Sequence, residues 1–339
     1  MINRFLFFIC LTSLMTGCSG DPLDVNVSDI EVDIQFERFE QKMFAAKSPQ
    51  EMKKINDELL ISGGELYEYY VWDMLRAGDP HDDSAGVYLY YFVSDSMMNV
   101  IVDDINTTFN DFPQQEEQIT NAFKHFKYHF PDKTVPEKII TYNSAFNYGV
   151  VSTDKYIGVG LEMYLGADNP IIQKIGFPQF MKAKMSKDYM LVDICHSWLI
   201  SNVMGEDKGE TFLTSALYYG KLRYAVDALL PDLEDHFKIR YTQEEYDWAL
   251  ASEYNIWQFL VDMEYIYSSE SKVKLRYFEE APTTVDMEGS PGRIGQFIGW
   301  QIVKQYMEKN PDVTVEQLLN ETNEGKILKA YKPIENEQS

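Results

Sequence analysis

The sequence contains few cysteines, which excludes a fold held together by disulfides. Of its 339 residues only Cys10, Cys18 and Cys195 are cysteine. If the amino-terminal segment is removed before Cys18 and this residue is lipidated, Cys195 has no intramolecular partner. Cys195 lies in an apolar stretch, which favours a buried, unreactive thiol. The folded chain is therefore expected to depend on packing alone, even in an oxidising compartment.

Histidine is scarce too, and the five histidines are poorly placed for a catalytic zinc, which needs three protein ligands and an open position. His125 and His129 have helical i, i+4 spacing, but Phe126 stands where a metallopeptidase motif has its Glu base. We expect both to be solvated surface residues. Cys195 and His196 are adjacent, so on a helix they point about 100° apart and cannot form a nucleophile–base pair. Serine-nucleophile, phosphate-loop and dinucleotide-binding patterns are absent from the sequence.

Basic residues are in the minority. The chain has 30 Lys and Arg against 54 Asp and Glu, a formal net charge of −24. A surface of that charge repels phosphates, so we exclude nucleic acid as a partner. Acidic charge also keeps proteins soluble, so it identifies no specific partner. The hydrophobic content of 45% is sufficient for a sizeable core.

Long hydrophobic runs are also lacking, and the longest is at the amino terminus. Arg4 precedes an apolar run over residues 5–14, and small residues then lead to Cys18. The run is shorter than the roughly 20 residues that span a bilayer, and its layout is typical of a secretory signal. The string LMTGC resembles a bacterial lipobox. We therefore predict a lipoprotein signal peptide over residues 1–17 and lipid attachment at Cys18. The alternative is an ordinary signal peptide with a chance cysteine.

The remaining chain shows no internal repeat and no linker long enough to separate two domains. Residues 18–29 are polar and acidic, which predicts a lipid-anchored tether. A globular domain is expected over residues 30–331, followed by a polar tail over 332–339. We predict the α+β class, with a mainly helical single domain around a small β-sheet.

Several strands and helices can be placed by pattern. Alternating apolar residues from Ile30 to Phe36 predict a half-buried strand. The strings KIITY, YGVVS and KYIGVGLEMYL predict further strands, with the last two joined as a hairpin through residues 152–155. A helix is expected to begin after Ser48 and to end at Gly63-Gly64, and another to begin at Ser186. Further helical patterns cover about 65–76, 85–108, 115–127, 211–229 and 243–266.

One glycine pattern is unusual. Ser290-Pro291 predicts a helix that reaches Met307, and Gly292, Gly295 and Gly299 fall within it at spacings of three and four. Each glycine costs up to ~1 kcal/mol relative to alanine in a helix interior. Close packing against another element of the chain would offset that cost. Alternatively, the glycines form a backbone docking surface for a partner, with Arg293 beside it.

Three strings together carry a resemblance to a known family. They are FNYGVVSTDKYIGVGLEMYLG, TFLTSALYYGKLRYAVDALLP and SPGRIGQFIGWQIVKQYM. In order and separation they resemble the gliding motility lipoprotein GldB family, over about residues 30–331. The resemblance implies an accessory lipoprotein of gliding motility and the associated type IX secretion machinery. It also implies the cell envelope, with the outer membrane facing the periplasm preferred and the inner membrane or cell surface as alternatives.

The family also resembles zinc metallopeptidases of the zincin type, which implies a degenerate zincin-like fold. Their HExxH helix would correspond here to residues 192–196, the string VDICH. On that alignment Val192 replaces the first ligand, Asp193 replaces the base, and His196 alone is kept. The position of the third ligand falls near Tyr219-Gly220, which offers no carboxylate. We therefore expect no enzyme activity and no cofactor, with His196 as a candidate metal ligand or a satisfied core histidine.

The preferred hypothesis is a non-catalytic scaffold held at a membrane by its lipid anchor, with unidentified gliding and secretion proteins of the envelope as partners. The first rival is an active zinc metallopeptidase of the zincin type whose ligands the motif does not reveal. The second is a glycan-binding surface lipoprotein, because 23 tyrosines and 5 tryptophans could stack on sugars.

Overall fold

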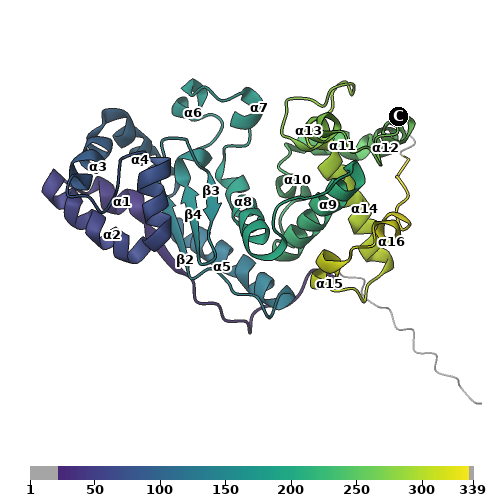
Figure 1. Ribbon diagram of the computed structural model, residues 1–339, viewed down its shortest axis with the longest axis horizontal. Helices are drawn as coiled ribbons and strands as arrows, with labels where there is room; N and C mark the ends of the chain where they lie inside the picture. Colours follow the sequence, from purple (N-terminus) through teal and green to yellow (C-terminus); the bar gives the residue numbers. More distant parts are fainter. Residues whose placement is uncertain (1–21, 336–339) are drawn as a thin grey trace, which may run out of the picture.

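A four-stranded mixed sheet lies near the middle of the molecule (Figure 1). The structure is a computed structural model that describes residues 22–335. Its strands are β1 (Gln35–Arg38), β2 (Lys138–Tyr142), β3 (Val150–Ser152) and β4 (Tyr156–Gly160), in the spatial order β1-β2-β4-β3. β1, β2 and β4 are parallel, whereas β3 runs antiparallel to β4 and forms one edge.

The sheet divides the hydrophobic core into two parts, because successive side chains of a strand point to opposite faces. On β2, Ile139 belongs to the larger cluster, whereas Ile140 and Tyr142 belong to the smaller one. The helices that contribute to the smaller cluster are α1 (Phe39–Phe44), α2 (Pro49–Tyr69), η1 (Tyr70–Met74) and α3 (Ala85–Ser94).

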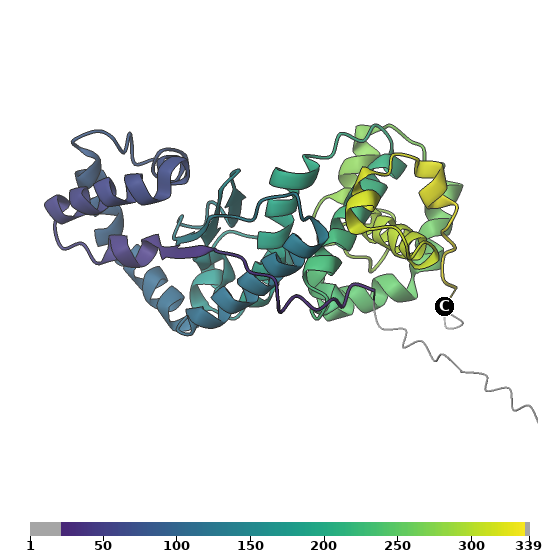
Figure 2. The same ribbon diagram turned by 90° about the horizontal axis from the view of Figure 1, so that it is seen from below.

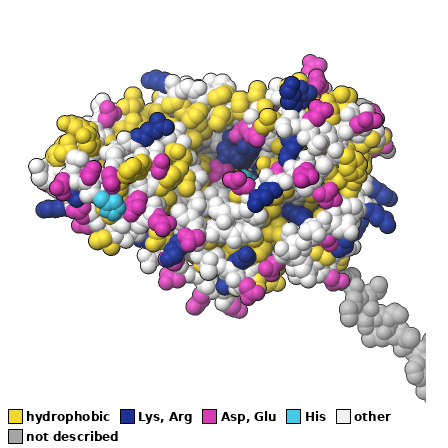
Figure 3. Space-filling model, in the orientation of Figure 1, with side chains coloured by type: hydrophobic (Ala, Val, Ile, Leu, Met, Phe, Trp, Pro, Cys, Tyr) yellow, Lys and Arg dark blue, Asp and Glu magenta, His cyan; other side chains and the backbone are white. Residues whose placement is uncertain are grey.

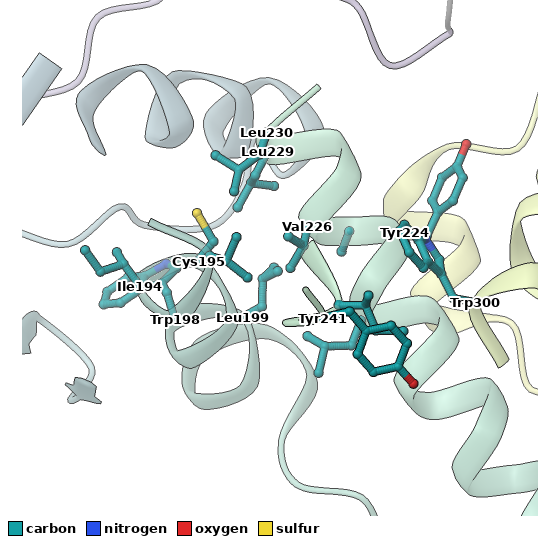
Figure 4. Packing of buried hydrophobic residues seen from close by; sticks show 14 of the residues in the cluster. Ile194, Cys195, Trp198, Leu199, Tyr224, Val226, Leu229, Leu230, Tyr241 and Trp300 are labelled. Carbon is teal, nitrogen blue, oxygen red and sulfur yellow. The ribbon is translucent and has the colours of Figure 1, made fainter. Parts of the chain in front are cut away.

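The larger cluster lies on the other face of the sheet. Figure 4 shows how Cys195 and Leu199 of one helix approach Val226 and Leu229 of another, while Trp300 of a third lies beside Tyr224. The helices that contribute most to this core are α5 (Phe112–His129), α8 (Lys187–Leu199), α9 (Phe212–Leu229) and α14 (Ile294–Lys309).

The remaining helices complete the fold. They are α4 (Ser96–Thr108), η2 (Leu161–Tyr164), α6 (Pro170–Lys174), α7 (Gln179–Lys182), η3 (Ile200–Met204), α10 (Asp235–Lys238), α11 (Gln243–Ala251), α12 (Glu253–Asp262), α13 (Ser271–Phe278), α15 (Val315–Asn320) and α16 (Glu324–Leu328). Within residues 22–335, no helix combines the length and apolar character needed to cross a membrane. The predicted α+β class, a mainly helical single domain around a small sheet, is confirmed.

The chain ahead of β1 packs on the domain. Leu23 and Val27 are only 8% and 7% exposed, and Leu23 belongs to the larger cluster. This segment runs along the underside of the domain in Figure 2. The strand predicted to begin at Ile30 begins at Gln35 instead. Its neighbour β2 begins at Lys138, which pairs with Gln35, so the earlier residues have no strand beside them.

The helix end predicted at Gly63-Gly64 is confirmed, because α2 consists of two helical segments joined at a kink. Gly64 forms this kink with a φ of 50°, a left-handed conformation that favours glycine. α14 begins at Ile294 rather than at Ser290, because Arg293 is left-handed with a φ of 59°. Gly292 therefore precedes the helix. KIITY forms a strand and the β3–β4 hairpin forms, both as predicted. The two hairpin strands are shorter than the strings YGVVS and KYIGVGLEMYL, since β3 begins at Val150 and β4 ends at Gly160, where a short helix follows.

Candidate functional site

A pocket of about 360 Å³ opens at the edge of the sheet. Gly149 and Val150 form one wall where β3 begins, and Asp193 and His196 of α8 form the floor. The opposite walls come from the segment that carries α6 and α7 and from residues near the ends of α10 and α13. In Figure 3, a hollow near the middle of the face holds dark-blue and magenta side chains next to one another. Pockets of about 470 and 710 Å³ also exist, but neither has a histidine or an arginine in its lining.

Helix α8 contributes the polar residues Asp193, His196 and Ser197 to this pocket. Asp193 and His196 are three residues apart, so they share one face of the helix. Val192 and Cys195 point into the core, and both are 0% exposed. Burial raises the pKa of the Cys195 thiol, which therefore stays protonated. Cys195 is buried, as predicted from its apolar surroundings.

Asp193 is held by two neighbours. Arg240 forms an ion pair with its Oδ2 atom, and the Tyr164 hydroxyl donates a hydrogen bond of 2.8 Å to the same oxygen. Burial, and then the charge of Asp193, raises the pKa of Tyr164 well above its usual value. The guanidinium of Arg240 also lies over the Tyr189 ring, 5.5 Å from its centroid. Asp193 therefore positions Arg240 and is not free to serve as a general base.

A second ion-pair network begins at Glu280, which lines the pocket. Glu280 accepts a hydrogen bond of 2.9 Å from Arg293 Nη2 and lies 3.7 Å from Lys184, which also pairs with Glu245 at 3.1 Å. Arg240 and Arg293 have φ values of 58° and 59°. Left-handed backbone is uncommon outside glycine, and such strain concentrates at functional sites. Both arginines are thus held here at a conformational cost.

Arg223 of α9 lies behind the pocket as a buried cation. It is 1% exposed and donates hydrogen bonds to Lys238 O at 2.9 Å and Gln296 Oε1 at 2.7 Å. Its Nε atom has no hydrogen-bond partner, and no carboxylate pairs with it among residues 22–335. Burial, followed by the charges of Arg293 and Arg240, lowers the pKa of Arg223 to about 9. A buried cation without a counter-ion is costly to maintain.

His196 meets the field of all three arginines. Its buried Nε2 atom has no hydrogen-bond partner. Burial first, and then the charges of Arg223, Arg293 and Arg240, holds the pKa of His196 well below its usual value. The imidazole is therefore neutral at pH 7. The predicted alternative of a satisfied core histidine does not describe it, since one ring nitrogen is unsatisfied.

The zinc implied by the metallopeptidase resemblance does not fit these residues. Val192 is apolar and buried where a first ligand would stand, and Asp193 is paired with Arg240. At the third position, Tyr219 stacks on Phe278. Among residues 22–335, no three His, Cys, Asp or Glu side chains are grouped to hold a metal ion. The nearby guanidinium groups would also repel a cation.

The glycines singled out in the sequence face other parts of the chain. A Cβ built on Gly295 would lie 2.7 Å from the Phe278 ring, and one on Gly299 would overlap the backbone of Ala216. Gly292 lies against the backbone of Ala281. Arg293 turns towards Glu280 at the pocket. Cys18, the predicted lipid attachment residue, lies outside the described residues.

The interpretation of His125 and His129 as solvated residues was wrong. His125 is 4% exposed, and burial lowers the pKa of His129 to about 4. Sequence reasoning also missed Arg240, Glu280 and Arg223. The one local signal was a cation inside the apolar string LRYAVDALL, since a buried arginine usually has a specific role.

Comparison with known proteins gives one match. The family model described as gliding motility protein GldB matches residues 20–333. No curated protein and no solved structure matches the chain.

Proposed function

Since the chain belongs to the family of the gliding motility protein GldB, we propose that it acts as a non-catalytic accessory or scaffold in gliding motility and the associated type IX secretion machinery. Family membership itself implies involvement in gliding motility and association with the cell envelope. The finer role, a scaffold that binds other envelope proteins, is supported by the chemistry of the pocket.

The ion pair between Asp193 and Arg240 carries the proposal. In a hydrolytic site a carboxylate at this place would have to accept a proton from water. Here Asp193 is already paired with the charged Arg240, and it accepts a hydrogen bond from the Tyr164 hydroxyl. His196 offers a single imidazole, and one ligand cannot hold a catalytic zinc. A site of this kind is suited to binding and not to bond cleavage.

The proposed scaffold is attached through Cys18. Stable attachment needs more than one acyl chain, and a lipidated amino-terminal cysteine supplies this. We place the domain in the envelope, preferably at the outer membrane on its periplasmic side. Its partners would be other gliding and secretion proteins of the envelope.

Zinc content and peptidase activity test the non-catalytic role. The full-length chain, purified in detergent, is analysed for metals and incubated with casein. We expect zinc far below one ion per chain and no cleavage. One tightly held zinc per chain, together with casein cleavage that His196→Ala abolishes, would overturn the proposal and establish a peptidase.

A second experiment addresses the scaffold role. The chain is cross-linked in cells and recovered from envelope fractions, with an unrelated lipoprotein of the same membrane as control. We expect gliding and secretion proteins to be enriched with this chain over the control. Equal recovery of those proteins with both baits would contradict the scaffold role.

A further inference from the structure

We infer that the pocket is a docking site for an extended polypeptide segment of a partner, which pairs with the free edge of β3 and places an acidic side chain among the arginines. The inference rests on the proposed function, because it gives the chemistry of a partner that the scaffold would bind. Three independent features support it, namely the strand edge, the local charge and the apolar wall.

The first feature is the unpaired edge of β3. In an antiparallel pair, the residues whose backbone groups face the neighbouring strand alternate along the chain. Gly160 N donates to Gly149 O at 2.6 Å, and Thr153 N donates to Tyr156 O at 2.9 Å. The N–H and C=O groups of Val150 and Ser152 therefore point away from β4, and no partner takes them up among residues 22–335. An open edge of this kind accepts a strand from another chain.

The second feature is a local excess of positive charge on an acidic protein. Arg240, Asp193 and Glu280 line the pocket, and the other charged groups of the cluster lie behind them. The whole cluster has four cations and three carboxylates, a surplus of one positive charge, although the chain carries −24. The surplus corresponds to Arg223, which has no carboxylate partner. A carboxylate that enters the pocket beside Arg240 would offset that surplus. It would also favour protonation of His196, which could then donate a hydrogen bond. The cations are Lys184, Arg223, Arg240 and Arg293, and the carboxylates are Asp193, Glu245 and Glu280.

The third feature is an apolar wall that continues from the strand edge. Three methionines line the pocket with Phe177 and Ile200. Methionine side chains adapt to differently shaped partners, and they are common at surfaces that bind peptides. A volume of about 360 Å³ accommodates one or two side chains of an extended segment. The methionines are Met163, Met181 and Met185.

Two peptide pools test the inference. Both consist of acetylated, amidated heptapeptides with six randomised positions, and the central residue is Glu in one pool and Gln in the other. Each pool is passed over the immobilised full-length chain, and retained peptides are identified by mass spectrometry. We expect retention of the Glu pool to exceed that of the Gln pool at least ~10-fold, because the carboxylate is desolvated among cations. Equal retention, or none of either pool, would overturn the inference.

A pair of variants tests the strand edge. Val150→Pro removes the outward N–H without breaking a bond to β4, and the preceding Gly149 tolerates proline. Val150→Ala removes the same side chain but keeps the N–H. We expect the proline variant to lose the Glu pool and the alanine variant to keep it, with thermal melts confirming that both are folded. Equal retention by two folded variants would refute strand pairing. If Val150→Pro does not fold, the test uses NMR spectra of Val150→Ala with the Glu peptides that it retains. We expect these peptides to shift the amide signals of Val151 and Ser152. Unshifted signals would also refute strand pairing.

Sodium acetate separates a polypeptide site from a small-anion site. The inference fails if two results are found together. In that case millimolar acetate displaces the Glu pool completely, and acetate binds equally well whether or not Val150 is replaced. The pocket would then be a site for a free carboxylate. Mass spectrometry of the eluted peptides gives a separate answer on the proposed function. Cleaved Glu peptides would end the non-catalytic proposal and leave the docking site intact.

Discussion

Gly220 on α9 and Gly299 on α14 lie against each other, so closely that a Cβ on Gly220 would overlap the carbonyl group of Gly299. A Cβ on Gly299 would likewise overlap the backbone of Ala216, one turn earlier on α9. The two helices lie in the larger core, which also packs on the sheet. Backbone contact at these glycines therefore sets how closely α9 and α14 approach each other.

We predict that Gly299→Ala destabilises the domain. Alanine favours a helix over glycine by up to about 1 kcal/mol, but overlap with a backbone cannot be relieved by a rotamer change. The net loss should be about 1–3 kcal/mol in free energy of unfolding, measured by chemical denaturation. Gly325→Ala in α16 is the matched control, since its nearest contact would be at 3.6 Å. The control should be neutral or slightly stabilised, and a similarly unaffected Gly299→Ala would contradict close packing.

The larger features of this fold follow from local patterns, but its contacts do not. KIITY and the capped helix starts are encoded within a few neighbouring residues, so their placement succeeds. The strand over Ile30–Phe36 was placed too early, because its beginning depends on Lys138, about a hundred residues away. The start of α14 was missed because Arg293 adopts a left-handed backbone that only tertiary contacts, such as its bond to Glu280, can hold.

The ion pair of Asp193 and Arg240 should behave as a coupled unit. Asp193→Asn leaves Arg240 partly buried without its counter-ion, and we expect a loss of about 1–3 kcal/mol after allowance for partial exposure. Adding Arg240→Gln should cost less than the sum of the two single changes. A double-mutant cycle by urea denaturation measures this coupling. Strict additivity would show that the pair is not formed.

An exposed ion pair provides the control for that cycle. Arg276 lies 3.0 Å from Asp286, with side-chain exposures of 34% and 53%. Asp286 has a φ of 70°, which asparagine tolerates. Asp286→Asn should therefore change the free energy of unfolding by less than about 1 kcal/mol.

Glu162 should make stability depend on pH. Its side chain is 0% exposed and accepts hydrogen bonds from Ser144 N at 2.7 Å and Phe146 N at 3.2 Å. Burial raises the pKa of Glu162 from 4.5 to about 7. The folded state binds the Glu162 proton more tightly than the unfolded state does. The resulting contribution to the free energy of unfolding is complete below pH 4.5 and is lost as the pH rises to about 7.

The variant Glu162→Gln isolates this effect, since the amide oxygen can accept the same bonds and does not titrate. We expect wild type to lose about 1.4 kcal/mol relative to the variant for each pH unit between those two values. Urea denaturation at a series of pH values gives the difference curve. A flat curve would mean that the Glu162 carboxyl has an ordinary pKa in the folded chain.

Cys18→Ser should leave the chain unprocessed or released from the membrane. The lipobox-like LMTGC motivates this expectation, because the acyl chains attach to the thiol. Detergent-phase partitioning of cell extracts measures it, and Cys10→Ser, which keeps the attachment residue, is the control. Recovery of both variants in the detergent phase would exclude lipidation at Cys18.

The sequence identified only some of the residues of the candidate site. VDICH identified Asp193 and His196 because a known motif has a fixed spacing on one helix. Arg240 and Glu280 follow α10 and α13, and nothing local to either residue indicates that they meet at α8. Charge composition was misleading as well, since an overall value of −24 conceals a small basic centre.

The packing of Leu23 and Val27 determines how the protein would sit at a membrane. If Cys18 carries the lipid, only Ser19, Gly20 and Asp21 separate it from the docked segment, and an extended chain of that length reaches about 14 Å. Pro22 and Leu23 share a hollow with the end of α5 and the start of α15. That side of the domain would then face the lipid headgroups. The link to the anchor would be too short for the domain to rotate freely. The anchor would fix the orientation of the docking pocket relative to the membrane, in addition to holding the protein at that membrane.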